Sequence, residues 1–124
     1  MRYLLDSNIV IWLLEEPTRI KAPVMDVLLD PSSELLVSTA SLLEIVSKAA
    51  SGRLTFEEEA RGKIEAVSKW LPVQEHHAWR VRSLPVLHKD PFDRILVAQA
   101  IEETLTLVTG DHRLADYGVP VLLT

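Results

Sequence analysis

The sequence predicts an α/β fold with helices on both faces of a mostly parallel central sheet. Short apolar runs alternate along the chain with longer amphipathic stretches, which indicates that strands alternate with helices. The length of 124 residues suits one ordinary domain, which we expect to span residues 1–124. No repeat, low-complexity tract or linker divides the chain.

The first part of the chain is expected to fold as strand, helix, helix and strand. Arg2–Leu5 is a short apolar run that predicts a buried strand. A helix over Asn8–Glu15 follows and stops before Pro17, which cannot continue it. Apolar residues at helical spacing predict a second helix over Ile20–Leu29. Glu34–Val37 then has the composition of a second strand.

The middle of the chain is mainly helical. Thr39–Ala50 predicts a helix that ends at Gly52. Phe56–Trp70 is also helical in pattern, and Thr55 with Glu58 three residues later matches a capping box. Two shorter elements complete this part, a strand over Leu71–Val73 and a helix over Glu75–Ser83.

The last third has the clearest signals. Asp90 suits the N-cap of a helix and Pro91 its first position, where the missing N–H costs nothing, and the helix should run to about Glu103. Leu105–Val108 is rich in residues that favour strands. The expected elements after it are a short helix that begins at the turn Gly110-Asp111 and a final strand over Val119–Leu123.

The composition excludes several classes of protein. Hydrophobic residues make up 48% and charged residues 25% of the chain, as in ordinary globular domains. The absence of cysteine excludes disulfides and thiol catalysis and suits the cytoplasm. The apolar run Ile9–Leu14 is too short to span a membrane, so no membrane association is expected. A mean hydropathy of +0.14 suggests that a partner or a second copy covers some apolar surface.

The net charge of −5 bears on nucleic-acid binding. Non-specific binders are usually basic, because phosphate contacts supply most of their affinity. Two arrangements would reconcile this charge with a nucleic-acid substrate. Metal ions could neutralise an acidic pocket, or a basic rim could lie beside that pocket.

Four acidic residues occupy equivalent places beside the expected strands. Asp6 directly follows the first strand, and Glu44 lies in the first turns of the helix after the second. Asp93 lies in the first turn of the helix that Asp90 opens. Asp111 lies shortly after the end of the strand expected over Leu105–Val108. Because the carboxyl ends of parallel strands share one edge of a sheet, these side chains should converge.

A cluster of carboxylates requires compensation, since like charges repel strongly at close range. Mg²⁺ and Mn²⁺ prefer hard oxygen ligands and would supply it. They would also promote in-line attack of water on a phosphodiester, and the sequence contains no evident Ser–His pair or Walker loop as an alternative. Taken singly, each acid also has a structural explanation: a helix cap at Asp6, a capping box or ion pair at Glu44, a favourable helix dipole at Asp93 and a turn at Asp111.

Over essentially its full length, the chain resembles PIN domains, and specifically the VapC-type toxins of toxin–antitoxin pairs. The resemblance rests on four segments, of which the third is the most specific: Asp6-Ser7-Asn8, Ser38 with Glu44, the stretch His88–Ala100, and Thr109-Gly110-Asp111.

The resemblance implies a three-layer, Rossmann-like α/β/α fold and an endoribonuclease that depends on Mg²⁺ or Mn²⁺. It further implies an RNA substrate, a cognate antitoxin that covers the first helices and the acidic cleft, and a homodimer. The implied site roles are these: Asp6 and Asp93 as principal metal ligands, Glu44 as the residue that completes the first metal site, Asp111 as a ligand of a second metal or a guide for the attacking water, and Asn8 and Thr109 as hydrogen-bond supports.

Some residues in or near these segments allow more than one interpretation. Asp90 is interpreted as an N-cap, but it would exchange roles with Asp93 if the helix began later. Arg94 is placed to reach a phosphate or, alternatively, to pair with a neighbouring acid. His76 and His77 are interpreted as surface residues, because adjacent helical residues point about 100° apart.

Two other functions remain open at this point. One is a non-catalytic binding module with the same fold, whose signature would be a missing acid. The other is a phosphatase with an acidic pocket. Such enzymes usually carry Asp-x-Asp after the first strand, where this chain has Asn8 two residues after Asp6.

Overall fold

The computed structural model describes residues 1–124 and contains one sheet of five strands. The strand order is β3-β2-β1-β4-β5, and every neighbouring pair is parallel. The strands are β1 (Arg2–Leu5), β2 (Glu34–Ser38), β3 (Lys69–Leu71), β4 (Thr106–Thr109) and β5 (Val121–Leu123). The predicted α/β fold is therefore confirmed, and its sheet is parallel throughout.

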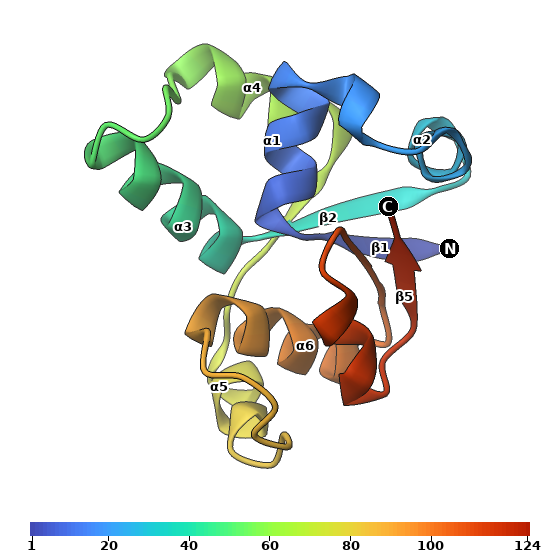
Figure 1. Ribbon diagram of the computed structural model, residues 1–124, viewed down its shortest axis with the longest axis vertical. Coiled ribbons are helices and arrows are strands. Elements are labelled where there is room, and N and C mark those ends of the chain that lie inside the picture. Colours follow the sequence, from blue (N-terminus) through green and yellow to red (C-terminus); the bar gives the residue numbers. More distant parts are fainter.

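Helices cover both faces of this sheet (Figure 1). On one face lie α1 (Ser7–Glu15), the 3₁₀ turn η1 (Pro17–Arg19), α2 (Ala22–Leu29), α3 (Thr39–Ala50) and α4 (Glu58–Val67). On the other lie α5 (Glu75–Val81), α6 (Pro91–Glu103) and η2 (His112–Tyr117). The molecule thus has the three layers expected of an α/β/α fold. None of its helices has both the length and the apolar character needed to cross a bilayer.

The two faces explain why the strands are continuous apolar runs, with polar residues only at their ends. Side chains along a strand alternate between faces, and here both faces are buried. Leu5 and Val37 belong to the core cluster beneath α1 and α2, together with Ile9 and Val24. On the opposite face, the second core cluster joins strand residues to α6 and η2: Leu4, Leu36, Leu107, Leu96, Val97 and Leu114.

The boundary between α4 and β3 differs from the prediction. The predicted helix Phe56–Trp70 ends at Val67, where the Ser68 backbone N–H and hydroxyl both donate to the carbonyl of Ile64. Trp70 instead lies in β3, which begins two residues earlier than the predicted strand and pairs with β2. Pairing with a distant strand has overridden a local helical pattern, as tertiary context often does.

Two predicted helix starts are also wrong. The N-cap of α4 is Glu57 and its side chain makes no capping hydrogen bond, so the box predicted at Thr55 does not form. The helix predicted from Ile20 begins at Ala22. A start at Ile20 would have placed Pro23 where a backbone N–H is needed, whereas α2 places it in the first turn.

The carboxyl ends of β1, β2 and β4 meet at one edge of the sheet, and three helical elements begin there. Asp6 is the N-cap of α1, Ser38 that of α3, and Asp111 that of η2. Helix α6 runs back toward β4, so its N-cap, Asp90, lies at the same edge. Residues at four helix N-termini are therefore gathered in one region.

Candidate active site

Asp6 lies at the centre of this edge, and only 5% of its surface is exposed. Its Oδ1 accepts a 2.7 Å hydrogen bond from the backbone N–H of Ser7, and its Oδ2 accepts one of 2.7 Å from the hydroxyl of Thr109. Burial raises the pKa of Asp6 above its ordinary value. These two hydrogen bonds oppose the rise, whereas the nearby charges of Glu44 and Asp111 add to it.

Asp93 approaches from α6, where it is the third residue. Burial, followed by the charges of Asp6 and Asp90, raises the pKa of Asp93 to about 6. A contact of 3.2 Å between His88 Nε2 and Asp93 Oδ2 opposes this rise. Two buried carboxylates from distant parts of the chain therefore repel each other, an arrangement that a cation would relieve.

The register of α6 is settled by its N-cap. Asp90 Oδ1 accepts hydrogen bonds from the backbone N–H groups of Phe92 (2.9 Å) and Asp93 (3.3 Å). The helix thus begins at Pro91, and the alternative in which Asp90 and Asp93 exchange places does not occur.

Glu44 reaches the cluster from α3. Its Oε1 accepts a 2.7 Å hydrogen bond from the hydroxyl of Ser7, and its Oε2 lies 3.5 Å from Nζ of Lys48. The capping box that Ser41 and Glu44 could form does not occur, because the hydroxyl of Ser41 is buried without a partner. Ser7 therefore links Glu44 to Asp6 through adjacent hydrogen bonds, while Lys48 offsets part of the charge of Glu44.

Asp111 completes the group from the end of β4. Both of its carboxylate oxygens accept hydrogen bonds from the guanidinium of Arg113, at 2.7 to 3.2 Å, and these bonds lower the pKa of Asp111. Ligand atoms of Asp111, Asp93 and His88 all lie within 4.8 Å of one another, close enough to share one ion.

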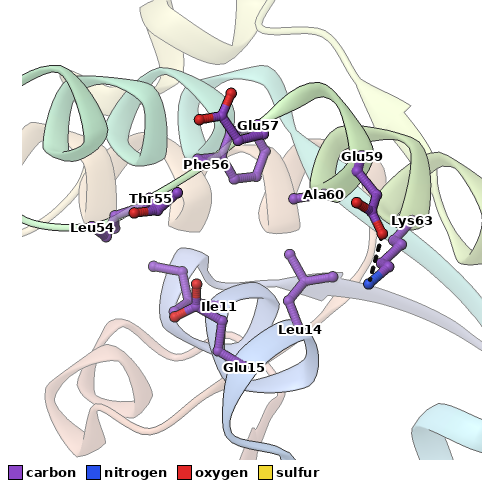
Figure 2. A pocket seen from close by; sticks show the side chains of 10 residues that line it. All are labelled: Ile11, Leu14, Glu15, Leu54, Thr55, Phe56, Glu57, Glu59, Ala60 and Lys63. Atoms are coloured by element: carbon purple, nitrogen blue, oxygen red, sulfur yellow. Dashed lines mark ion pairs between the residues drawn. The ribbon is translucent and has the colours of Figure 1, made fainter.

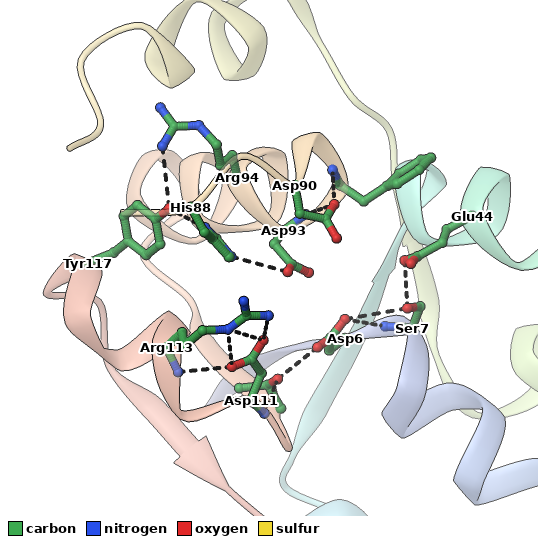
Figure 3. A network of polar contacts seen from close by, with 12 residues as sticks. Asp6, Ser7, Glu44, His88, Asp90, Asp93, Arg94, Asp111, Arg113 and Tyr117 are labelled. Atoms are coloured by element: carbon green, nitrogen blue, oxygen red, sulfur yellow. Dashed lines mark hydrogen bonds and ion pairs between the residues drawn. The ribbon is translucent and has the colours of Figure 1, made fainter. Parts of the chain in front are cut away.

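Figure 3 shows Asp6, Glu44, Asp93 and Asp111 around a common space. Two of the carboxylates come from the N-caps of α1 and η2 and two from within α3 and α6, so the topology brings together residues far apart in the sequence. Hard oxygen donors dominate this set, which fits Mg²⁺ or Mn²⁺ better than a soft metal. The raised pKa values of Asp6 and Asp93 also fit, because a bound cation would favour their ionised forms.

Two predicted site residues, the supporting residue Asn8 and the phosphate-binding residue Arg94, are placed differently from expectation. Asn8 is exposed and its side chain makes no hydrogen bond, so Ser7 and not Asn8 supports the carboxylates. The guanidinium of Arg94 donates to the backbone carbonyls of Pro85 (2.7 Å) and Val81 (3.2 Å) and is turned away from the acids in Figure 3. This geometry argues against the phosphate contact predicted for Arg94.

A second cluster of metal-binding residue types lies away from the site, between α5 and α6. His77 is only 1% exposed, so its interpretation as a surface residue is wrong. Its Nδ1 accepts a hydrogen bond from the backbone N–H of Gln74, which leaves the proton of the neutral ring on Nε2. That nitrogen contacts Glu103 at 2.9 Å. The cluster therefore joins α5 to α6 and does not offer the Nε2 lone pair to a metal.

The parallel sheet has helices on both faces and a carboxylate cluster at its carboxyl edge. These two features define a class of α/β proteins with an acidic candidate cation site. Residues 3–120 match the PIN domain family, and this chain belongs to that family, whose members are generally nucleases. No curated protein matches the chain by sequence. The family predicted from the sequence is thus confirmed.

Solved structures share the fold over nearly the whole chain. A chain of VapBC2 from Rickettsia felis, bound to a promoter DNA fragment, matches with a TM-score of 0.75 and 16% identity, over 99% of this chain and 98% of the other. DNA-bound VapBC from Salmonella typhimurium matches with a TM-score of 0.71 and 15% identity, over 98% and 97%. The PIN domain endonuclease Utp24 matches with a TM-score of 0.61 and 15% identity, over 99% and 84%.

Proposed function

We propose that this chain is an endoribonuclease that hydrolyses RNA phosphodiester bonds with Mg²⁺, or with Mn²⁺ in its place. The observation that carries the proposal is the convergence of Asp6 and Asp93, which are 5% and 9% exposed and both have raised pKa values. Burying two carboxylates within reach of each other's charge is unfavourable unless a cation binds between them. The match to the PIN domain family supports the nuclease assignment.

In this proposal Asp6 and Asp93 hold the cation, and Glu44 completes its site. Asp111 holds a second cation or orients the attacking water. A bound divalent cation would polarise the scissile phosphate and make water a stronger nucleophile at neutral pH. Ser7 and Thr109 keep the carboxylates in place through their hydrogen bonds to Glu44 and Asp6.

The proposal is tested by cleavage of RNA by the purified protein. Asp6→Asn and Asp93→Asn should each abolish cleavage, because they remove a charged ligand while keeping the shape of the side chain. Excess EDTA should have the same effect on the wild type. Asp26→Asn is the matched control, since Asp26 is exposed on α2, away from the cluster, and should leave cleavage unchanged. Full activity of either site variant, or of the wild type in EDTA, overturns the proposal.

The same assay distinguishes the proposed ribonuclease from a phosphatase and from a non-catalytic binding module. A phosphatase with an acidic pocket would hydrolyse a phosphomonoester such as p-nitrophenyl phosphate and spare RNA. A non-catalytic module would bind RNA without cleaving it at any concentration of Mg²⁺ or Mn²⁺.

We further propose that the chain is the VapC-type toxin of a toxin–antitoxin pair, acts in the cytoplasm as a single domain of residues 1–124, and forms a homodimer. A groove lined by five hydrophobic and five polar or charged residues lies between α1 and the segment that leads into α4 (Figure 2). Ile11 and Leu14 form one wall, and Leu54, Phe56 and Ala60 form the other. An amphipathic segment of the antitoxin would cover this groove, and α1, which forms one of its walls, begins at the acidic edge.

The partner assignments have their own tests. The product of the neighbouring gene should co-purify with this chain and suppress cleavage. Ile11→Glu should break that complex without changing the cleavage of RNA by the free protein. Light scattering that shows a strict monomer, together with no binding to the neighbouring gene product, would refute both the dimer and the toxin–antitoxin assignment.

A further inference from the structure

His88 and Tyr117 are absent from the site predicted by the sequence, yet they lie beside it. His88 lies in the loop between α5 and α6, and its side chain is 10% exposed. Tyr117 ends η2, on the opposite side of His88 from Asp93, and is 9% exposed. The Tyr117 hydroxyl lies 2.6 Å from His88 Nδ1, and His88 Nε2 lies 3.2 Å from Asp93 Oδ2.

The direction of these hydrogen bonds follows from Arg94. Arginine has only donors, so its contact of 3.3 Å with the Tyr117 hydroxyl must place an N–H against the oxygen. The hydroxyl has one hydrogen of its own, and the short contact with His88 Nδ1 is the partner available to it. Nδ1 of His88 is therefore the acceptor. A neutral imidazole carries its single proton on the other nitrogen, so Nε2 donates to Asp93.

We propose that Arg94, Tyr117 and His88 form a directed hydrogen-bond chain that orients Asp93 for cation binding, with His88 as a positioning residue. The inference rests on the cation site proposed above. His88 occupies Oδ2 of Asp93, whereas Oδ1 has no hydrogen-bond partner in the protein and stays available to the ion. Hydrogen bonds from outside the ligand set orient metal ligands in this way and commonly change metal affinity 10- to 100-fold.

Direct ligation by His88 is the alternative, because His88, Asp93 and Asp111 are close enough to share an ion. Ligation through Nε2 would move the proton to Nδ1, which would then donate to Tyr117. The Tyr117 hydroxyl would accept from both His88 and Arg94, and its own hydrogen would lose its partner in a buried site. Such a loss costs on the order of 1–3 kcal/mol, so the observed contacts favour positioning over ligation.

The tautomer is the first test, and it requires neither metal nor RNA. A long-range ¹H–¹⁵N correlation spectrum of the wild-type protein should show His88 with its proton on Nε2, and adding Mg²⁺ should leave it there. A proton on Nδ1, in either condition, overturns the proposal. Tyr117→Phe should remove the single preferred tautomer, because Nδ1 then loses its donor.

The second test is the affinity for Mn²⁺, followed by the loss of the free-ion paramagnetic resonance signal. Tyr117→Phe should raise the Kd for Mn²⁺ about tenfold. Tyr3→Phe is the matched control, because Tyr3 is equally buried and its hydroxyl contacts only the sulfur of Met1, at 3.8 Å. It should leave the Kd unchanged.

If Tyr117→Phe does not fold, two variants of His88 test its positioning role instead. Gln carries an N–H at about the place of Nε2, so His88→Gln should stay within about threefold of the wild-type Kd, whereas His88→Leu should lose about tenfold. Equal affinities for His88→Leu and the wild type overturn the positioning role alone. Absence of Mn²⁺ binding by the wild type overturns the proposed cation site, and the positioning role with it.

Discussion

The hydroxyl of Thr109, at the end of β4, donates a 2.7 Å hydrogen bond to Oδ2 of Asp6, at the end of β1. The two residues are 103 positions apart in the sequence, and neither is more than 5% exposed. The same hydroxyl accepts a 3.0 Å bond from the backbone N–H of Asp111. One side chain thus ties the two strand ends that carry two of the four acids.

Thr109→Val keeps the shape of this side chain and removes both hydrogen bonds. The pKa of Asp6 should rise further, because the Thr109 hydroxyl is the strongest influence that lowers it. Cleavage of RNA should fall about tenfold, and Thr109→Ser should restore most of it. Thr106→Val, on the same strand but without a side-chain hydrogen bond, is the control. Wild-type activity in Thr109→Val would show that Asp6 needs no such support.

The stability of the metal-free protein should depend on Asp93. Its pKa is about 6 in the folded chain against an ordinary 3.8, so the folded state binds more protons than the unfolded state between these values. Stability should therefore fall as the pH rises from about 4 to about 6, and stay lower above that. In EDTA at pH 7, Asp93→Asn should be more stable than the wild type by on the order of 2 kcal/mol, with little difference at pH 4.

Urea unfolding at the two pH values, with Asp26→Asn as control, measures this difference. Addition of Mg²⁺ should then stabilise the wild type and leave Asp93→Asn unchanged, because only the intact site binds the ion. A wild type that gains stability as the pH rises through this window would show that Asp93 is already ionised without metal.

The strands and the positions of the acidic residues could be predicted from the sequence for a physical reason. Strands buried on both faces are continuous apolar runs, and the residue after such a run lies at the carboxyl edge, as Asp6 does. Trp70 was misplaced because its partner, Val37 in β2, lies 33 residues earlier, beyond the reach of a local pattern.

The supporting contacts could not be predicted in the same way. Ser7 reaches Glu44 across 37 residues, and nothing in the spacing distinguishes it from its neighbour Asn8. Arg94 follows Asp93 directly, yet successive helical side chains point about 100° apart. Its guanidinium therefore lies against the carbonyls of Val81 and Pro85, away from the acids.

Gly110 leaves room for an aromatic ring close to the site. A Cβ at this position would lie 2.9 Å from Cη2 and 3.2 Å from Cζ3 of Trp12, so Gly110→Ala must displace a rigid ring or the backbone before Asp111. We expect a loss of stability of about 1–3 kcal/mol and reduced cleavage. Gly62→Ala, in α4 with open space around it, should instead stabilise the protein by about 0.5–1 kcal/mol. Thermal unfolding of the pair provides the comparison, and equal melting temperatures would refute the predicted clash.

Arg113 should compete with the cation for Asp111. Its guanidinium holds both carboxylate oxygens of Asp111 and lowers the pKa of that acid, while the Arg113 side chain is itself 65% exposed. Because an exposed pair of this kind is weak, Arg113→Ala should tighten the binding of Mn²⁺ in the absence of RNA by only about threefold. Calorimetric titration measures this change, with Arg61→Ala as control, since Arg61 pairs only with acids of α4. If Arg113→Ala binds Mn²⁺ no more tightly than the control, Asp111 does not hold the ion, and its remaining role would be to orient the attacking water.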